Sequence, residues 1–462
     1  MVYLRYVSLA VYKDKHISMS YIPHTEAERQ QMLAEIGVTT IEDLFEAVPA
    51  SHRFPKINIP KALSEMEILA EMQAYAEANE HAGDFALFRG AGAYHHYSPS
   101  VVNHMLMRGE FYTAYTPYQP EVSQGTLQVI YEYQSMICAL TGMDAANASH
   151  YDGATALAEA ITMSLEVGRY KRKKVILSPT INPQYRAVVR TYHQGRDVKL
   201  VGDKGGASIQ DLVDMLDENT AMLAISYPNF WGQIDDLKDL AEKVHQVGAL
   251  LVMVVNPMAL GMFKAPGELG ADIVVGEGQP LGIPLSYGGP YIGFFATRME
   301  YVRKIAGRIV GETRDKEGRR AFVMTLRPRE QDIRREKATS NICTNQGLMA
   351  LAACVYMTLV GKTGLRKIAE LNYHKAHYLA DQIDKIAGYK VNRDRPFFNE
   401  FVVKCPTSVH NINQALIEQG IIGGYDLEKD YPTLKDHMLL CVTEMNSKEE
   451  MDALVQVLAE VK

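Results

Sequence analysis

Two segments of the chain combine polar aromatic residues with glycine or proline. The first, FRGAGAYHHYSP (88–99), contains Tyr94, His95 and His96 after a Gly-x-Gly turn. These rings make a poor core because each needs a hydrogen-bond partner when it is buried. We therefore interpret the segment as a loop that lines a site; the alternative is an ordinary loop with a helix cap at Ser98. A dinucleotide-binding motif does not fit, because no strand precedes the glycines.

The second segment, FYTAYTPYQPEVSQG (111–125), is held in an extended path by two prolines. It leads into a helix predicted over 126–140, and the free N–H groups at the start of a helix favour anionic ligands. The candidate contact residues are Tyr115, Tyr118, Glu121 and Ser123. Glu121 and Ser123 equally suit helix capping, and the two roles do not exclude each other.

A third segment, ANASHYDGATALA (146–158), brings small and hydroxyl residues to the start of an Ala-rich helix. Ser149, Gly153 and Thr155 are candidate hydrogen-bond donors to a phosphate group at this point. Close packing of the helix would use the same small residues. The residues alone therefore leave the phosphate cup and the packing role open.

Short apolar runs alternate with helical segments between about residues 145 and 300, and this pattern predicts a mainly parallel, doubly wound α/β sheet. Ligands of such a sheet lie beyond the carboxyl ends of its strands. One strand runs into the Gly- and Pro-rich loop 272–290, which would lie at that edge. The predicted strands are Val175–Leu177, Val198–Val201, Met222–Ile225, Leu250–Val255, Ile273–Val275 and Tyr291–Phe295.

The rest of the chain divides into shorter parts. Capping boxes at Thr25-x-x-Glu28 and Ser64-x-x-Glu67 predict a helical N-terminal segment. After a long helix predicted near 363–386, short strands and helices indicate a small α+β domain. We expect an extension over 1–18, the helical segment over 19–88, a large α/β domain over 89–340 and the small domain over 341–462.

Composition excludes several classes of function. The 462 residues carry 48 Lys+Arg and 55 Asp+Glu, and the net charge of 48 − 55 = −7 disfavours nucleic-acid binding. Five scattered cysteines without a C-x-x-C pair indicate a reducing compartment, the cytoplasm. The longest apolar run, Ala249–Val255, is too short to span a membrane, and the histidines show no metal-binding spacing.

Three long strings resemble the glycine cleavage system P-protein family, the glycine dehydrogenases (decarboxylating), and the resemblance runs from about Tyr21 to the C-terminus. They are TAYTPYQPEVSQGTLQVIYEYQSMICALTGMDAANAS (113–149), GELGADIVVGEGQPLGIPLSYGGPYIGFFA (267–296) and REQDIRREKATSNICTNQGLMA (329–350). Some members of the family are split into two subunits, and this chain is similar to subunit 1, the alpha subunit.

The resemblance implies a fold and a reaction. The fold is that of pyridoxal-phosphate (PLP) enzymes of the aminotransferase type, fold type I, with a mostly parallel seven-stranded sheet and a small C-terminal domain. The family decarboxylates glycine and transfers the aminomethyl group to the lipoyl arm of the H-protein, in one system with the T-protein and L-protein.

PLP chemistry needs a lysine, an acidic partner for the ring nitrogen and a phosphate cup. Loop 272–290 contains no lysine, and Gln279 or Pro280 stands about where the resemblance places one. The neutral Asn256 follows strand 250–255 at the expected position of an aspartate. The resemblance therefore implies that the cup at Ser149, Gly153 and Thr155 is vestigial and that the beta subunit carries PLP.

Sites of this fold form at a dimer interface, so loops of one subunit can reach the site of the other. We hypothesise that the two polar aromatic loops line the entrance for glycine and the lipoyl arm, through Tyr94, His95, His96, Tyr115, Tyr118, Glu121 and Ser123. Two alternatives stay open: a free-standing PLP aminotransferase or lyase with a lysine from elsewhere, and a structural homologue without a catalytic complex. Segment 327–337 is mixed in charge, so its charged residues either pair with one another or dock the carrier protein, the H-protein, which the resemblance implies is acidic.

Overall fold

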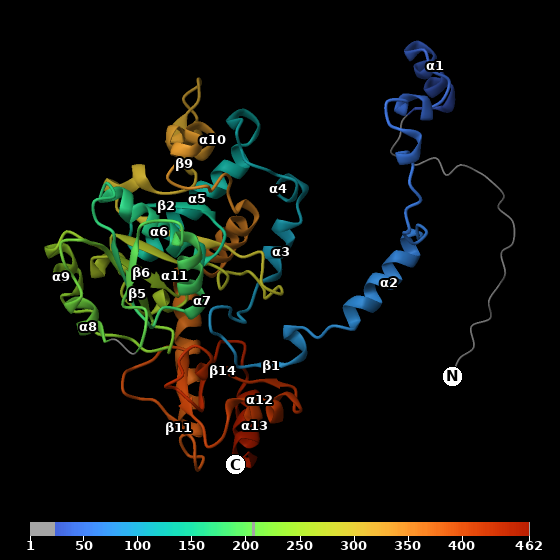
Figure 1. The fold of residues 1–462 in the computed structure, drawn as a ribbon. Coiled ribbons are helices and arrows are strands. Elements are labelled where there is room, and N and C mark those ends of the chain that lie inside the picture. The colour runs from blue at the N-terminus through green and yellow to red at the C-terminus, as the bar shows by residue number, and fades with distance from the viewer. Residues whose placement is uncertain (1–23, 206–207, 462) are drawn as a thin grey trace, which may run out of the picture. The chain divides into compact units, whose positions relative to one another are not determined.

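The computed structural model describes residues 24–205 and 208–461, so the expected extension over 1–18 lies outside the described residues (Figure 1). The chain divides into an N-terminal unit that ends at Asn79 and a main unit that begins at Glu80. Each is described by itself below.

Local signals define the helices of the N-terminal unit. Its helices are α1 (Glu26–Ile36) and α2 (Glu65–Glu77). Both predicted capping boxes are confirmed, because the Thr25 and Ser64 hydroxyls accept the N–H groups of Glu28 and Glu67. Among the described residues of this unit Leu33 alone is buried. Capping and helix propensity therefore specify these helices in place of a core.

The main unit is built on a seven-stranded sheet with the order β2-β8-β7-β6-β5-β3-β4. Neighbours among β3 to β7 pair in parallel, whereas β8 is antiparallel to both β2 and β7. All six predicted strands are confirmed. The bounds are β2 (Ala145–His150), β3 (Lys174–Leu177), β4 (Lys199–Val201), β5 (Thr220–Tyr227), β6 (Leu250–Val255), β7 (Ile273–Glu277) and β8 (Gly293–Thr297).

The seventh strand, β2, was not predicted. Its sequence AANASH lacks the β-branched and aromatic residues that favour strands, so pairing with β8 and burial decide its conformation. The hairpin of β9 (Ile309–Arg314) and β10 (Arg320–Thr325) was also missed.

Helices cover both faces of the sheet. On one face, α6 (Gly153–Val167) and α7 (Pro183–His193) pack on Leu250, Val252 and Val254. On the other, Leu251, Met253 and Val255 pack with α5 (Gln124–Thr141), α8 (Ile209–Asp214), α9 (Leu240–Gln246) and the start of α11. Burial of both faces explains why β6 is apolar at every position.

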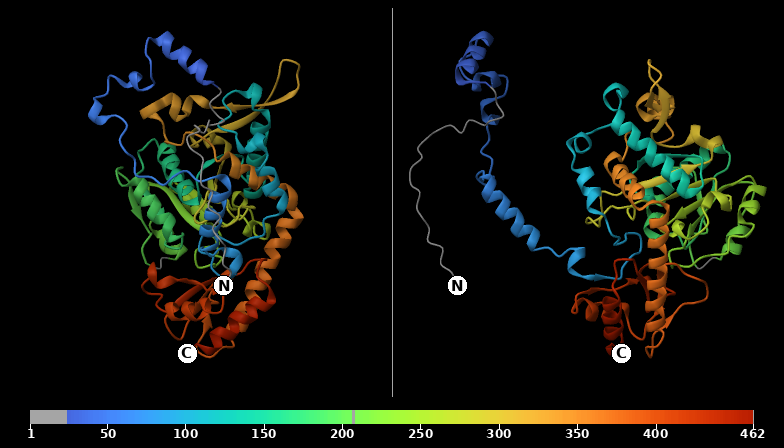
Figure 2. Two further views of the ribbon diagram at one scale, coloured as in Figure 1. Left: turned by 90° about the vertical axis from the view of Figure 1, so that its right-hand side faces the viewer. Right: turned by 180° about the vertical axis from the view of Figure 1, so that it is seen from behind.

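Helix α11 (Gly347–Ile383) joins the sheet domain to the small domain (Figure 2). The sequence predicts a helix only from Thr363 onward, which is the second half of α11. The two halves meet at Gly361, whose backbone is not helical. Residues such as Ala353 pack on the sheet and residues such as Leu379 on the small domain. Among the described helices α11 alone is long and apolar enough to span a membrane, by length and composition, and 39% of that apolar stretch is buried in the structure.

The small domain is a four-stranded antiparallel sheet covered by helices. Its order is β11-β12-β15-β14. Its elements are β11 (Lys390–Val391), β12 (Glu400–Lys404), α12 (Val409–Ile417), β14 (Tyr425–Asp426), β15 (His437–Cys441) and α13 (Lys448–Glu460). The short strand β1 (Ala86–Leu87) pairs in parallel with β13 (Ile421–Ile422), which ties the chain before the first polar aromatic loop to this domain.

A turn after β5 connects the two domains through the backbone. Ile234 N–H donates to the Pro396 carbonyl (2.8 Å), and Phe398 N–H donates to the Gly232 carbonyl (3.1 Å). Gly232 has φ +78°, and a Cβ there would overlap the carbonyl of Glu400.

We expect Gly232→Ala to lower the free energy of unfolding by about 2–5 kcal/mol, since a left-handed backbone and overpacking each destabilise. Gly318→Ala is the matched control, because Gly318 has φ +77° and no atom within 4 Å of its Cβ position. It should lose only the backbone part, about 1–2 kcal/mol. Urea unfolding measures both, and equal losses would show that the contact with Glu400 does not matter.

Candidate functional site

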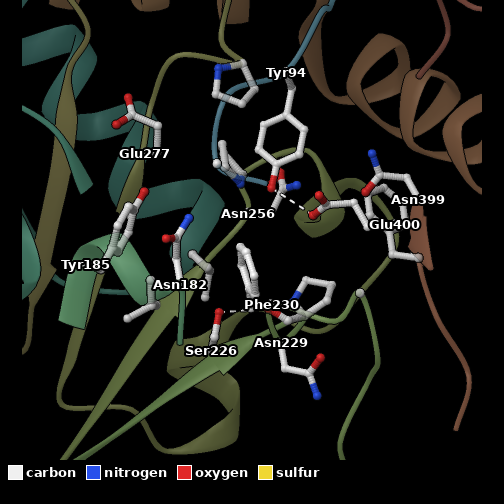
Figure 3. A pocket seen from close by; sticks show the side chains of 18 residues that line it. Tyr94, Asn182, Tyr185, Ser226, Asn229, Phe230, Asn256, Glu277, Asn399 and Glu400 are labelled. Atoms are coloured by element: carbon white, nitrogen blue, oxygen red, sulfur yellow. Dashed lines mark hydrogen bonds between the residues drawn. The ribbon is translucent and has the colours of Figure 1, made fainter. Parts of the chain in front are cut away.

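A small cavity of about 60 Å³ lies at the carboxyl ends of β5, β6 and β7, between the sheet and the small domain (Figure 3). This is the edge at which a doubly wound sheet binds its ligands. Asn256 and Pro280, foreseen from the sequence, border it. The lining residues are Gly92, Tyr94, Asn182, Tyr185, Ser226, Pro228, Asn229, Phe230, Gly232, Val254, Val255, Asn256, Pro257, Glu277, Pro280, Phe398, Asn399 and Glu400.

Glu400 and Tyr94 form one side of the cavity. The Tyr94 hydroxyl donates to Glu400 Oε2 (2.9 Å), and the Ala91 N–H donates to Oε1 (2.7 Å). Burial raises the pKa of Glu400 to about 7, against the effect of these two hydrogen bonds. Burial also raises the pKa of the Tyr94 hydroxyl, which therefore stays protonated and acts as the donor. The first polar aromatic loop is thus fixed to the small domain.

Glu277 forms the opposite side, where β7 ends. Its Oε2 accepts the N–H of Gly153, the first residue of α6 (3.1 Å), and its Oε1 accepts the N–H of Gln279 (3.0 Å). Burial, with a smaller contribution from the nearby Asp152, raises the pKa of Glu277 to about 8, against the lowering effect of these two hydrogen bonds. Asp152 in turn accepts the Thr155 N–H (2.7 Å). Two N–H groups in the first turn of α6 therefore already bond to carboxyl oxygens of the chain itself.

Gln279 fastens the two loops of the site together. Its amide oxygen accepts the Tyr94 N–H (2.8 Å), and its amide nitrogen donates to the carbonyls of Tyr94 (2.9 Å) and Ile283 (2.7 Å). The residue is only 1% exposed, and these bonds use the oxygen and both amide hydrogens. The position near which the resemblance places a lysine thus holds Tyr94 in place.

The remaining candidates of the first loop lie beside the small domain. His96 is buried with Nδ1 2.8 Å from Glu444 Oε2. His95 is half-buried, which lowers its pKa, and its carbonyl accepts the Thr443 hydroxyl (2.6 Å). Neither residue borders the cavity.

The second loop lies elsewhere in the main unit. Tyr115 is 78% exposed and borders a separate cavity of about 220 Å³ together with Thr344. Tyr118 packs under the Arg308 guanidinium, 4.7 Å from its ring centre. Glu121 is exposed, and Ser123 stands at the N-cap position of α5 without a side-chain hydrogen bond. The seven candidates therefore do not surround one cavity of this chain.

The proposed cup residues separate in the same way. Gly153 and Thr155 bond to carboxyl oxygens as described. The Ser149 hydroxyl accepts the Arg308 N–H (2.9 Å) and donates to Asn345 (2.7 Å). Among the described residues, none of the three lines the cavity at Glu277 or the cavity at Tyr115.

Sequence reasoning missed Glu277 and Glu400, the two carboxyls of the cavity. Glu277 lies inside loop 272–290, where its position at the end of a predicted strand was a usable signal. Glu400 begins a strand of the small domain, and its partner Tyr94 lies 306 residues away in sequence. No local pattern reveals such a contact.

The cavity residues do not fit PLP. Among the described residues that line the cavity there is no lysine, and the Asn256 amide oxygen accepts the Met258 N–H (3.0 Å). Glu277 fills the anion-favouring start of α6, and about 60 Å³ has room for only a few water molecules. The described residues also hold no group of three His, Cys, Asp or Glu placed for a metal ion.

Comparison with known proteins gives the family. The family model of the glycine cleavage system P-protein matches residues 19–458. A probable glycine dehydrogenase (decarboxylating) subunit 1 from Thermomicrobium roseum is 55% identical, over 96% of this chain and 99% of its own length. The protein of the same name from Geobacillus sp. is 51% identical, over 95% and 98%.

Solved structures agree. The crystal structure of a glycine decarboxylase (P-protein), in inhibitor-bound form, has a TM-score of 0.87 and 41% identity, and the match covers 96% of this chain and 100% of that one. Glutamate decarboxylase from Lactobacillus brevis, at 13% identity and a TM-score of 0.66 over 90% of this chain and 96% of its own, shows the shared fold type I alone. The chain belongs to the glycine cleavage system P-protein family.

Proposed function

We propose that the chain is subunit 1 of a two-subunit glycine dehydrogenase (decarboxylating) that works in the cytoplasm. Its partner, subunit 2, carries PLP and the reactive lysine. The complex decarboxylates glycine and passes the aminomethyl group to the lipoylated H-protein, in one system with the T-protein and L-protein. The observation that carries the proposal is the cavity: it lies where this fold places its cofactor, yet the Glu277 carboxyl fills the start of α6 and no described lysine borders it.

Exposed aromatic side chains support a contribution to the partner's site. In the second loop, Tyr112, Tyr115 and Val122 are 60%, 78% and 81% exposed. Each would bury apolar surface on contact with a partner, which favours association. In the proposal, the second loop lines the substrate entrance of the other subunit through Tyr115, Tyr118, Glu121 and Ser123. Tyr94 and His96 position the first loop through Glu400 and Glu444, and His95 lies between them.

The location of PLP can be tested directly. Purified alone, the chain should give no PLP absorbance band that borohydride removes, whereas the reconstituted complex should give one band per pair of subunits. After borohydride reduction, peptide mapping should place the labelled lysine in subunit 2. A labelled lysine in this chain would instead favour the free-standing PLP enzyme.

Replacement of Tyr115 tests the contribution of the second loop. We expect Tyr115→Ala to lower glycine-dependent carbon dioxide exchange by the reconstituted complex about tenfold, the effect typical of an aromatic contact residue. Tyr170→Ala is the control, because Tyr170 is also an exposed tyrosine (50%) and follows the end of α6, outside the second loop. Wild-type exchange by Tyr115→Ala, with PLP content unchanged, would refute the role of Tyr115. Absence of exchange by the wild-type complex would favour a non-catalytic homologue.

The buried carboxyl of Glu277 predicts a pH dependence of stability. Its pKa is about 8 in the folded chain against an ordinary value of 4.5, so the folded state binds more protons between these pH values. Stability therefore falls as the pH rises from 4.5 to 8. Glu277→Gln removes this titration and should make the decline shallower by up to about 1 kcal/mol per pH unit. Urea unfolding at pH 5, 6.5 and 8 measures it, with the exposed Glu428→Gln as control; an unchanged slope would contradict the assignment.

A further inference from the structure

The edge of the sheet next to β2 carries an excess of positive charge. Residues 300–337 contain 12 Lys+Arg and 7 Asp+Glu, so this stretch has a net charge of 12 − 7 = +5 within a chain of −7. It forms the turn η7 (Met299–Lys304), the hairpin β9–β10 and the short helix α10 (Gln331–Arg334). Figure 1 shows α10 beside the hairpin at one end of the main unit.

A pocket of about 70 Å³ opens among these elements and the last turn of α6. Its charged lining residues are Arg303, Lys304, Arg329, Arg334, Glu166 and Glu330. Both carboxylates form ion pairs: Glu166 with Lys304 (2.8 Å), and Glu330 with Arg308 (3.2 Å), which does not line the pocket. The Glu330 oxygens accept no hydrogen bond from the described residues.

Three guanidinium groups of the pocket remain without a carboxylate. Arg303, Arg329 and Arg334 have no ion-pair partner among the described residues, and the charged residues that line the pocket have a net charge of 4 − 2 = +2. Thr339 and Ser340 also line it, but their hydroxyls already donate to the carboxylates of Glu166 and Glu159, so the arginines are its free donors. Such a lining suits a small anion.

Arg329 shows how the anion would be held. Its Nη1 donates to the Ile305 carbonyl (2.6 Å), which fixes the plane of the guanidinium. Its Nε and Nη2 are buried and have no hydrogen-bond acceptor among the described residues. These two nitrogens share one edge of the planar group and match two oxygens of a carboxylate or phosphate. Buried donors without an acceptor are destabilising, so a ligand that supplies both oxygens would be favoured.

We propose that this pocket is a second binding site, which takes an oxyanion on the Nε and Nη2 edge of Arg329, with Arg303 and Arg334 adding positive charge. It is separate from the cavity at Glu277. Glu166 lies in the last turn of α6 and Gly153 in the first, about 20 Å apart at 1.5 Å per residue. The oxyanion comes either from free phosphate or from a carboxylate on the acidic carrier protein, and the second source rests on the proposed function.

The first experiment is a calorimetric titration of the full chain with inorganic phosphate at low ionic strength. Arg329→Gln should weaken binding about tenfold or more, the effect of one charge-assisted pair. Arg334→Gln should weaken it as well. The Arg334 side chain is exposed and forms no hydrogen bond or ion pair with a described residue, so this variant keeps the test valid if Arg329→Gln fails to fold. Arg366→Gln is the control, since Arg366 is an exposed arginine paired with Glu370 on α11 (2.9 Å).

The second experiment measures association of the reconstituted two-subunit complex with the lipoylated carrier protein over a series of salt concentrations. Phosphate binding that is lost in both pocket variants and kept in Arg366→Gln identifies a free-anion site. The other outcome is that phosphate does not bind, while carrier association is salt-sensitive and is weakened by both pocket variants but not by Arg366→Gln. That outcome identifies a carboxylate of the carrier as the ligand. Unchanged behaviour of both pocket variants in both experiments overturns the site. Failure of the proposed function would appear separately, as absence of glycine-dependent exchange by the wild-type complex.

Discussion

The hydrogen bond from the Gly153 N–H to the Glu277 carboxyl determines what the main cavity can hold. The start of a helix attracts an anion because its N–H groups lack partners and its dipole is positive there. In this chain a carboxyl at the end of β7 takes that position, and Asp152 takes the Thr155 N–H beside it. Because both acceptors belong to the chain, a phosphate would have to displace a buried side chain to bind at this point.

The same carboxyl connects the sheet to the loops around it. Glu277 accepts the Gln279 N–H, and Gln279 in turn holds the backbone of Tyr94. Tyr94 then donates to Glu400 of the small domain. One chain of hydrogen bonds therefore runs from α6 through the cavity to the small domain. Because the two carboxyls have raised pKa values, both are partly protonated near neutral pH, which limits the charge buried in this space.

Repetitive patterns made most of the fold predictable. Six strands of the sheet, the two capping boxes and the small domain follow from apolar runs, periodicity and cap residues. The prediction missed β2 because Ala145–His150 is a strand through its pairing with β8 and not through its composition. It recognised only part of α11, because Gly361 interrupts one helix that serves two cores.

The site was less predictable, since its contacts join distant parts of the chain. The sequence singled out Gln279 and Pro280 because a lysine was expected near them, and Asn256 because an aspartate was expected there. It could not show that Gln279 satisfies the backbone of Tyr94, nor that Glu400 lies opposite Glu277. These pairings depend on how the small domain meets the sheet, and residue types alone do not contain that information.

The cavity and the outer surface of the main unit differ in a way that bears on function. The polar groups of the cavity are largely bonded to one another, as Gln279, Glu277 and Glu400 show. Two kinds of group outside the cavity would gain partners on binding. The apolar side chains of the second loop are exposed to solvent, and the Nε and Nη2 atoms of Arg329 have no hydrogen-bond acceptor among the described residues. Binding energy comes from groups that gain partners on association. The chain therefore has more to gain at its surfaces, by contact with other molecules, than from a cofactor in its own cavity.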